Sequence, residues 1–173
     1  MAPKLTIRRA VASEAGVLAD LAIEAWERDL RPYLTGAAAS REAEYERLRT
    51  AAEDGYSRII VAELGGEPVG WCQRLAGRPY ILFLFVAPGA QNRGTGRALL
   101  RRTESMMELE GADRVQLDTL ADNVRAVNFY QHQGYQILAL KTDGRPGRDL
   151  AVSVRLEKRL NPWHGPIDDI HNE

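Results

Sequence analysis

Gly94 and Gly96 enclose Thr95, with an arginine on either side, in the stretch QNRGTGRALL at residues 91–100. A glycine has no Cβ, so its backbone can approach a ligand closely. The stretch also opens a run with helical spacing, and the free N–H groups at a helix start can bind an anion with help from the helix dipole. These residues indicate an anion-binding cradle, with an ordinary tight turn as the alternative.

Two well-known phosphate-binding patterns do not fit this stretch. A Walker loop requires a lysine after its last glycine, and here Arg97 follows Gly96. A dinucleotide fingerprint requires a third glycine in the first βα unit, whereas Leu99 occupies that position and the loop lies in the middle of the chain. Both patterns are therefore excluded.

A third pattern fits, and a second segment supports it. Residues 91–96 read QNRGTG, which matches Q/R-x-x-G-x-G/A, and residues 123–135 read NVRAVNFYQHQGY, which resembles N-x-x-A-x-x-x-Y-x-x-x-G-F/Y. Both segments resemble the GNAT superfamily of N-acetyltransferases and occur in that family's order. The resemblance covers residues 5–157 and is strongest from 82 to 135.

The resemblance implies acetyl-coenzyme A as the cosubstrate, without a metal. It implies a loop that binds the pyrophosphate and a preceding strand whose backbone pairs with the pantetheine arm. A backbone N–H near Phe85 or Val86 would polarise the thioester carbonyl. The predicted cofactor-binding residues are Leu84, Phe85, Val86, Gln91, Asn92, Arg93, Gly94, Thr95, Gly96, Arg97, Ala98, Asn123 and Tyr130.

Two of these residues have further predicted roles. The resemblance implies that the Tyr130 phenol hydrogen-bonds or protonates the leaving thiolate of coenzyme A. Asn123 is expected to cap a helix in addition to contacting the coenzyme. For Arg97, a solvated surface charge is an equal alternative to coenzyme binding.

The acceptor amine must lose a proton before it attacks, and Asp118 is the predicted base. It stands where some GNAT members carry a glutamate, so a water would bridge its shorter side chain to the amine. A strand-end aspartate bonded to the backbone is the alternative. The residues predicted for the acceptor pocket, each with core packing as the alternative, are Trp26, Arg31, Tyr33, Trp71 and Tyr80.

The elements around these residues predict an α/β (α+β) fold in the order β-α-α-β-β-β-α-β-α-β-β. Alternating or continuous apolar runs predict strands at 5–9, 58–64, 67–75, 80–87, 114–120, 135–141 and 149–157. We expect a mixed, largely antiparallel sheet of about seven strands flanked by about four helices. The resemblance implies that the sheet splays between its fourth and fifth strands. Residues 1–160 are expected to form one domain, and residues 161–173 a tail that is docked or flexible.

Composition limits the class of protein. The chain has 173 residues, 45% of them hydrophobic and 27% charged, which is enough for one globular domain with a core. The net charge of −1 gives no electrostatic reason to expect nucleic acid, and no apolar stretch reaches membrane-spanning length. A single cysteine, Cys72, excludes an internal disulfide and suits a reducing compartment. We therefore expect a cytoplasmic protein without nucleic-acid or membrane partners.

The sequence thus predicts an N-acetyltransferase that moves the acetyl group of acetyl-coenzyme A to a primary amine of a small molecule or peptide. Direct attack in a ternary complex is expected, because no activated nucleophile is visible. A homodimer is expected from the family. Two alternatives stay open: a non-catalytic coenzyme A-binding regulatory module on the same fold, and a transferase for another acyl-coenzyme A.

Overall fold

The computed structural model describes residues 3–142 and 151–162. Within these ranges, a seven-stranded sheet has the order β1-β2-β3-β4-β5-β7-β6. Its strands are β1 (Leu5–Arg9), β2 (Ile59–Leu64), β3 (Glu67–Arg74), β4 (Tyr80–Val86), β5 (Arg114–Leu120), β6 (Gln136–Thr142) and β7 (Val152–Arg159). The α-helices are α1 (Ala15–Asp29), α2 (Arg41–Gly55), α3 (Thr95–Leu109) and α4 (Val124–His132). Among these seven described strands, only β4 and β5 pair in parallel, so the predicted mixed, largely antiparallel fold is confirmed.

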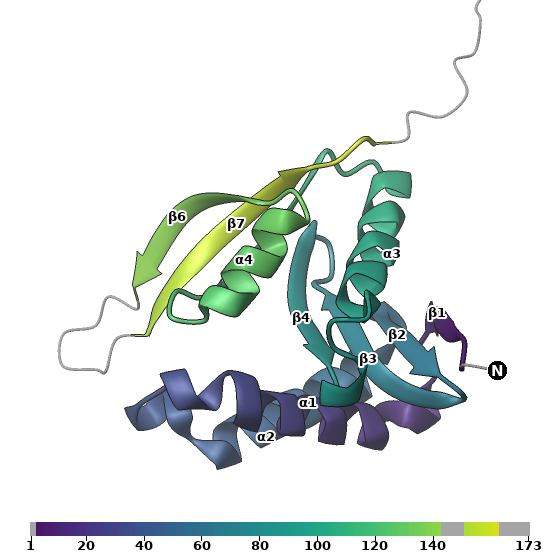
Figure 1. Ribbon diagram of the computed structural model, residues 1–173, viewed down its shortest axis with the longest axis horizontal. Helices are drawn as coiled ribbons and strands as arrows, with labels where there is room; N and C mark the ends of the chain where they lie inside the picture. Colours follow the sequence, from purple (N-terminus) through teal and green to yellow (C-terminus); the bar gives the residue numbers. More distant parts are fainter. Residues whose placement is uncertain (1–2, 143–150, 163–173) are drawn as a thin grey trace, which may run out of the picture.

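Helices cover both faces of the sheet (Figure 1). The pair α1 and α2 packs on one face of β2, β3 and β4, and α3 packs on the opposite face. Strand β2 shows the reason, because Ile59 and Val61 point to the α1–α2 pair while Ile60 and Ala62 point to α3, and all four are buried. A strand covered on both faces needs apolar residues throughout. Strand β6, at the edge of the sheet, is instead exposed along its whole length.

Buried polar contacts fix the α1–α2 pair to the sheet. The indole Nε1 of Trp71 donates to the Leu18 carbonyl at 2.9 Å. Gln73 Nε2 donates to the carbonyls of Ala51 at 2.8 Å and Gly55 at 3.3 Å. A Cβ at Gly55 would lie 2.0 Å from Gln73 Nε2. The end of α2 can therefore contact β3 in this way only because residue 55 has no side chain.

The sheet opens between β4 and β5. Only two residue pairs join these strands, Tyr80 with Gln116 and Ile81 with Leu117. Leu82 then forms a bulge, because the pairing of β4 with β3 skips it. No further β4–β5 pair occurs among the described residues, so the edge of β4 from Leu82 to Val86 lacks a strand partner on this side. The predicted splay between the fourth and fifth strands is confirmed.

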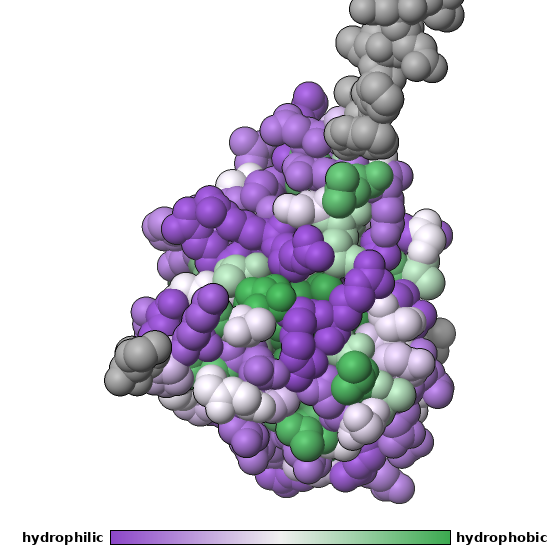
Figure 2. Space-filling model, turned by 90° about the vertical axis from the view of Figure 1, so that its right-hand side faces the viewer, coloured by the Kyte–Doolittle hydropathy of each residue, from purple (hydrophilic) through white to green (hydrophobic). Residues whose placement is uncertain are grey.

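Polar side chains dominate the surface seen in Figure 2, where apolar side chains form small separate groups. In residues 3–142 and 151–162, no helix has the length and apolar character needed to cross a membrane. The same ranges contain no group of three His, Cys, Asp or Glu side chains arranged to hold a metal ion. Of the predicted tail, only residues 161 and 162 are described, and the Asn161 amide donates to Glu108 Oε1 at 3.0 Å. The remainder, residues 163–173, lies outside the described residues.

Candidate active site

The predicted cradle lies at the start of α3. Gly94 is the N-cap with φ of +81°, and it has no side chain that could cap the helix. Asn92, two residues earlier, also has a left-handed backbone with φ of 57°. The first amide to enter the helical ladder belongs to Ala98, which donates to the Gly94 carbonyl at 2.9 Å. The N–H groups of residues 95–97 precede it and are available to an anion.

Ala98 therefore differs from the prediction, because its amide is already used inside the helix. The Arg93 and Arg97 side chains are exposed beside the cradle. A Cβ at Gly96 would lie 3.3 Å from a ring carbon of Phe129 and 3.7 Å from Val86 Cγ2. This glycine thus lets three segments meet: the cradle, the end of β4 and helix α4.

Gln91 connects the cradle to its neighbours. Its Nε2 donates to the Val86 carbonyl at 3.0 Å, and its Oε1 accepts from Arg125 Nη2 at 2.7 Å. Arg28 Nη2, on α1, donates to the same Val86 carbonyl at 3.4 Å. We call these four residues the Gln91 bridge. It joins α1, the end of β4 and the first turn of α4. The Gln91 side chain, which was predicted to contact the coenzyme, is therefore already hydrogen-bonded within the protein.

Tyr130, on α4, is a buried residue with 9% exposure. The rings of Phe129 and Tyr135 pack edge-on against it, with centroids 5.2 and 5.7 Å away. Burial raises the pKa of the Tyr130 phenol, so its hydroxyl keeps its proton at neutral pH. Asn123 Oδ1 accepts from the Ala126 amide at 3.2 Å, as expected for the N-cap of the helix that holds Tyr130.

Asp118, on β5, is tied to two cations. Its Oδ1 accepts from Arg155 Nε at 2.8 Å, and its Oδ2 accepts from Arg155 Nη2 at 2.9 Å and Lys141 Nζ at 3.2 Å. Partial burial acts to raise the pKa of this carboxyl, but the hydrogen bonds and charges of the two cations together lower it. A carboxylate with both oxygens engaged is a weak proton acceptor. The geometry suits Asp118 better for orienting Arg155 than for direct proton abstraction.

The residues predicted for the acceptor pocket separate in the structure. Trp26 and Trp71 are 2% and 0% exposed and belong to the core under α1 and α2. Their assignment to the pocket was wrong, since the packing of the two helices on the sheet covers both indole rings. Arg31 and Tyr33 lie in the short turn after α1, where Tyr33 is 44% exposed. Tyr80, at the start of β4, is half-buried.

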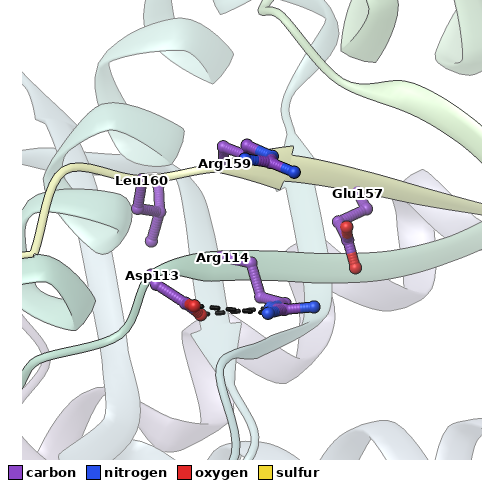
Figure 3. A pocket seen from close by; sticks show the side chains of 5 residues that line it. All are labelled: Asp113, Arg114, Glu157, Arg159 and Leu160. Atoms are coloured by element: carbon purple, nitrogen blue, oxygen red, sulfur yellow. Dashed lines mark hydrogen bonds and ion pairs between the residues drawn. The ribbon is translucent and has the colours of Figure 1, made fainter.

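Two hollows lie near the start of β5. The first, of about 310 Å³, is lined by residues that include Arg78, Tyr80, Arg114, Gln116 and Arg155, and we call it the arginine hollow. The second, of about 220 Å³, brings Asp113 and Arg114 together with Glu157, Arg159 and Leu160 from the end of β7 (Figure 3). No residue predicted to bind the coenzyme lines either hollow, so both are separate from the cradle.

Arg125, Lys141 and Arg155 are not among the site residues predicted from the sequence. Arg155 is the one cation inside the alternating run AVSVRLE, which was a usable signal. Its pairing opposite Asp118 depends on the register of β5 and β7, which the sequence does not state.

Residues 21–135 match the acetyltransferase (GNAT) family. The chain belongs to this family. The match confirms the GNAT acetyltransferase family that the two motifs predicted.

Individual relatives agree with this membership. The chain is 31% identical to an uncharacterized N-acetyltransferase, YhfO of Bacillus subtilis, over 140 residues that cover 76% of this chain and 90% of YhfO. It is 43% identical over 60 residues to the mycothiol acetyltransferase of Beutenbergia cavernae, covering 35% of this chain but only 20% of that protein. The fold matches the PaiA N-acetyltransferase of Thermoplasma acidophilum in complex with coenzyme A, with a TM-score of 0.67, 18% identity and coverage of 90% and 99%.

Proposed function

We propose that the protein transfers the acetyl group of acetyl-coenzyme A to a primary amine of a small molecule or peptide. One observation carries the proposal: the uncapped amides at the start of α3 lie directly beside the open edge of β4. A Cβ placed on Gly96 would lie 3.7 Å from Val86 Cγ2, which supports this neighbourhood. An anion site next to an unpaired strand edge suits a cosubstrate with a pyrophosphate at one end and an amide-rich arm.

Each segment has a proposed task in binding. The amides of residues 95–97 hold the pyrophosphate, and Arg93 and Arg97 add charge-assisted hydrogen bonds. The backbone of residues 84–86 pairs with the pantetheine arm, and an N–H near Phe85 polarises the thioester carbonyl.

Tyr130 is the proposed acid. The amine nitrogen forms a bond to the thioester carbonyl carbon, the carbon–sulfur bond breaks, and the Tyr130 hydroxyl donates its proton to the departing sulfur. Its raised pKa keeps that proton available at neutral pH. We propose that the proton of the acceptor ammonium leaves through a water held near Asp118, because the carboxylate oxygens are already bonded to Arg155 and Lys141.

Direct transfer within a ternary complex is favoured over a covalent acetyl-enzyme. The single cysteine, Cys72, is fully buried, and burial raises the pKa of its thiol to about 12. A thiol in this state supplies almost no thiolate at neutral pH.

A cytoplasmic location and a homodimer are further proposals. The absence of a second cysteine in the sequence is consistent with a reducing compartment. The exposed edge strand β6 carries Ile137, Leu138 and Leu140 at 49–70% exposure, and a second copy of the chain could cover them. Sedimentation of the purified protein would measure the oligomeric state.

The test of the activity is release of free coenzyme A thiol from acetyl-coenzyme A across a panel of amines, with binding of acetyl-coenzyme A measured in parallel. Thiol release with one class of amine would establish the enzyme. Binding without release from any amine would favour the regulatory module, and faster release from another acyl-coenzyme A would identify a different acyl donor. Failure to bind acetyl-coenzyme A would contradict the proposal.

A further inference from the structure

The structure offers a polar surface opposite the coenzyme side of the sheet. In the β5–β7 pairing, Gln116 lies opposite Glu157, and Asp118 lies opposite Arg155. Their neighbours Leu117 and Leu156 point the other way, into the core that contains Tyr130. Because side chains alternate along a strand, Asp118 and Arg155 lie on the face away from α4. The cradle lies at the start of α3, on the other face of the sheet. The acceptor can therefore approach from the face that carries Asp118 and Arg155.

The arginine hollow lies on this polar face. Arg155 is held by Asp118, and its guanidinium lies 5.8 Å from the centroid of the Tyr80 ring. Tyr80 is also the first residue of β4, the strand whose open edge is proposed to bind the pantetheine arm. Tyr80 therefore connects the hollow to the strand that carries the proposed site of reaction.

The charged side chains that line the hollow are all arginines, and two of them are paired with an acidic residue beside it. Arg78, Arg114 and Arg155 line it, and no acidic residue does. Asp113 and Asp118, which pair with Arg114 and Arg155, are not among the lining residues. Arg78 has no ion-pair partner among the residues that the structure describes. In the neighbouring hollow in Figure 3, the acidic residues Asp113 and Glu157 themselves line the hollow together with Arg114 and Arg159.

We infer that the acceptor carries a carboxylate or phosphate group that binds in the arginine hollow while its amine lies at the opening between β4 and β5. This inference rests on the proposed function and names the acceptor class for it. Guanidinium groups present paired N–H donors that match the oxygens of both anions. Asp118 acts here as a positioning residue, since it fixes the guanidinium of Arg155.

The distance along β4 sets the size of the acceptor. Tyr80 and Phe85 are five residues apart, and one of the residues between them is the Leu82 bulge. At about 3.3 Å per residue, the remaining four steps span roughly 13 Å. An extended peptide covers this length in about four residues, so an acidic side chain four residues after a reacting N-terminus would reach the hollow.

The test uses peptides with a free N-terminus that are identical except at the fifth residue, which is glutamate, phosphoserine or glutamine. A small ω-amino acid and its amide form a second matched pair. KM and kcat come from thiol release, and calorimetry measures binding of each acceptor to the protein with coenzyme A. We expect KM and Kd about tenfold lower for at least one anionic acceptor than for its neutral partner, with similar kcat. The glutamate and phosphoserine arms distinguish carboxylate from phosphate.

Charge reversal gives the sharper readout. Arg78→Glu should abolish the preference for the anionic acceptor and lower KM for a peptide with lysine at the same position. Arg102→Glu, at an exposed position of α3, is the matched control and should leave the preference unchanged.

Equal KM and Kd for anionic and neutral acceptors would overturn the inference, while thiol release from both would leave the proposed function standing. If no acceptor releases thiol, the proposed function fails, and calorimetry alone decides the inference by the presence or absence of the anionic preference.

Discussion

Tyr130 combines a buried ring with a hydroxyl that keeps its proton, which is the state that a general acid needs before a thiolate departs. We predict that Tyr130→Phe lowers kcat by about 100-fold, the range typical of a positioned acid. The dissociation constant of acetyl-coenzyme A should change by less than about twofold, because the ring and its packing remain. Tyr56→Phe, at a residue 37% exposed, is the control and should retain full turnover. Unchanged kcat in the Tyr130 variant would remove it as the acid.

The size of a side chain at position 96 is limited by neighbouring residues as well as by the proposed ligand. We predict that Gly96→Val weakens acetyl-coenzyme A binding at least about tenfold, because the new side chain meets Phe129 and crowds the amides of the cradle. Gly89→Ala is the control in the same connection, since a Cβ at Gly89 meets nothing within 4 Å. Isothermal titration of both variants measures the effect, and a normal dissociation constant for Gly96→Val would contradict the cradle.

Asp118 gives a pH-dependent prediction. Its folded pKa is lowered by Arg155 and Lys141, so its ion pairs stabilise the fold above the unfolded pKa of about 3.9 and are lost as the pH falls through the folded value. Asp118→Asn should therefore lower the free energy of unfolding at pH 7, by about 0.5–1 kcal/mol for a partly exposed pair. Near pH 2 the variant and the parent should be equally stable.

Urea unfolding at both pH values measures this difference. Asp20→Asn, at an exposed position on α1, serves as the control. A difference that persists at pH 2 would mean that Asp118 stabilises the fold through contacts other than its charge.

At the scale of elements, the Gln91 bridge holds α4 against the cradle. We predict that Arg125→Ala and Gln91→Ala each lower kcat/KM for acetyl-coenzyme A several-fold, because Tyr130 is carried by the same short helix. In free-energy terms, the loss of kcat/KM in the double variant should be smaller than the sum of the two single losses, by a coupling energy of about 0.5–1 kcal/mol. Arg101→Ala, exposed on α3, is the control. Additive losses in steady-state kinetics would show that the two side chains act separately.

The elements themselves were largely predictable. The apolar run at residues 80–87 predicted β4, and the alternating run at residues 5–9 predicted β1. Local spacing reports these features because burial follows a period of two or 3.6 residues.

Other features needed three-dimensional contacts. The Leu82 bulge and the pairing of Asp118 with Arg155 depend on register between strands. The alternating pattern around Trp71 is the same whether its ring lines a pocket or packs in a core. The ring lies in the core because its indole N–H donates to the Leu18 carbonyl on α1, a contact that the sequence pattern does not report. Arg125 was visible as a charge, but its partner lies 34 positions away in the sequence.

At the scale of the whole molecule, two halves of the sheet meet at the short β4–β5 seam. Glu104 on α3 reinforces the joint, because it accepts from the Tyr135 hydroxyl at 2.7 Å and from Lys158 Nζ at 2.8 Å. These contacts attach α3 to β7 and to the segment between α4 and β6. The molecule can therefore keep an open edge on β4 without separating its halves.

The open seam predicts a pattern of hydrogen exchange. Amides in residues 82–86 that face β5 have no strand partner there and should exchange quickly in the free protein. Saturating acetyl-coenzyme A should slow exchange in this segment by at least about tenfold, while β2, paired on both sides, should stay unchanged. Mass spectrometry of peptides covering both segments measures this. Binding without protection at residues 82–86 would place the pantetheine arm elsewhere.

The contact of Gly55 with Gln73 has a consequence for how this sequence can change over generations. Any side chain at position 55 collides with the glutamine amide, and a shorter residue at position 73 alone removes its hydrogen bonds to the end of α2. Each single change is thus costly, whereas a larger residue at 55 together with a smaller one at 73 refills the same space. Residues 55 and 73 should therefore change together in descendants in which the end of α2 still packs on β3.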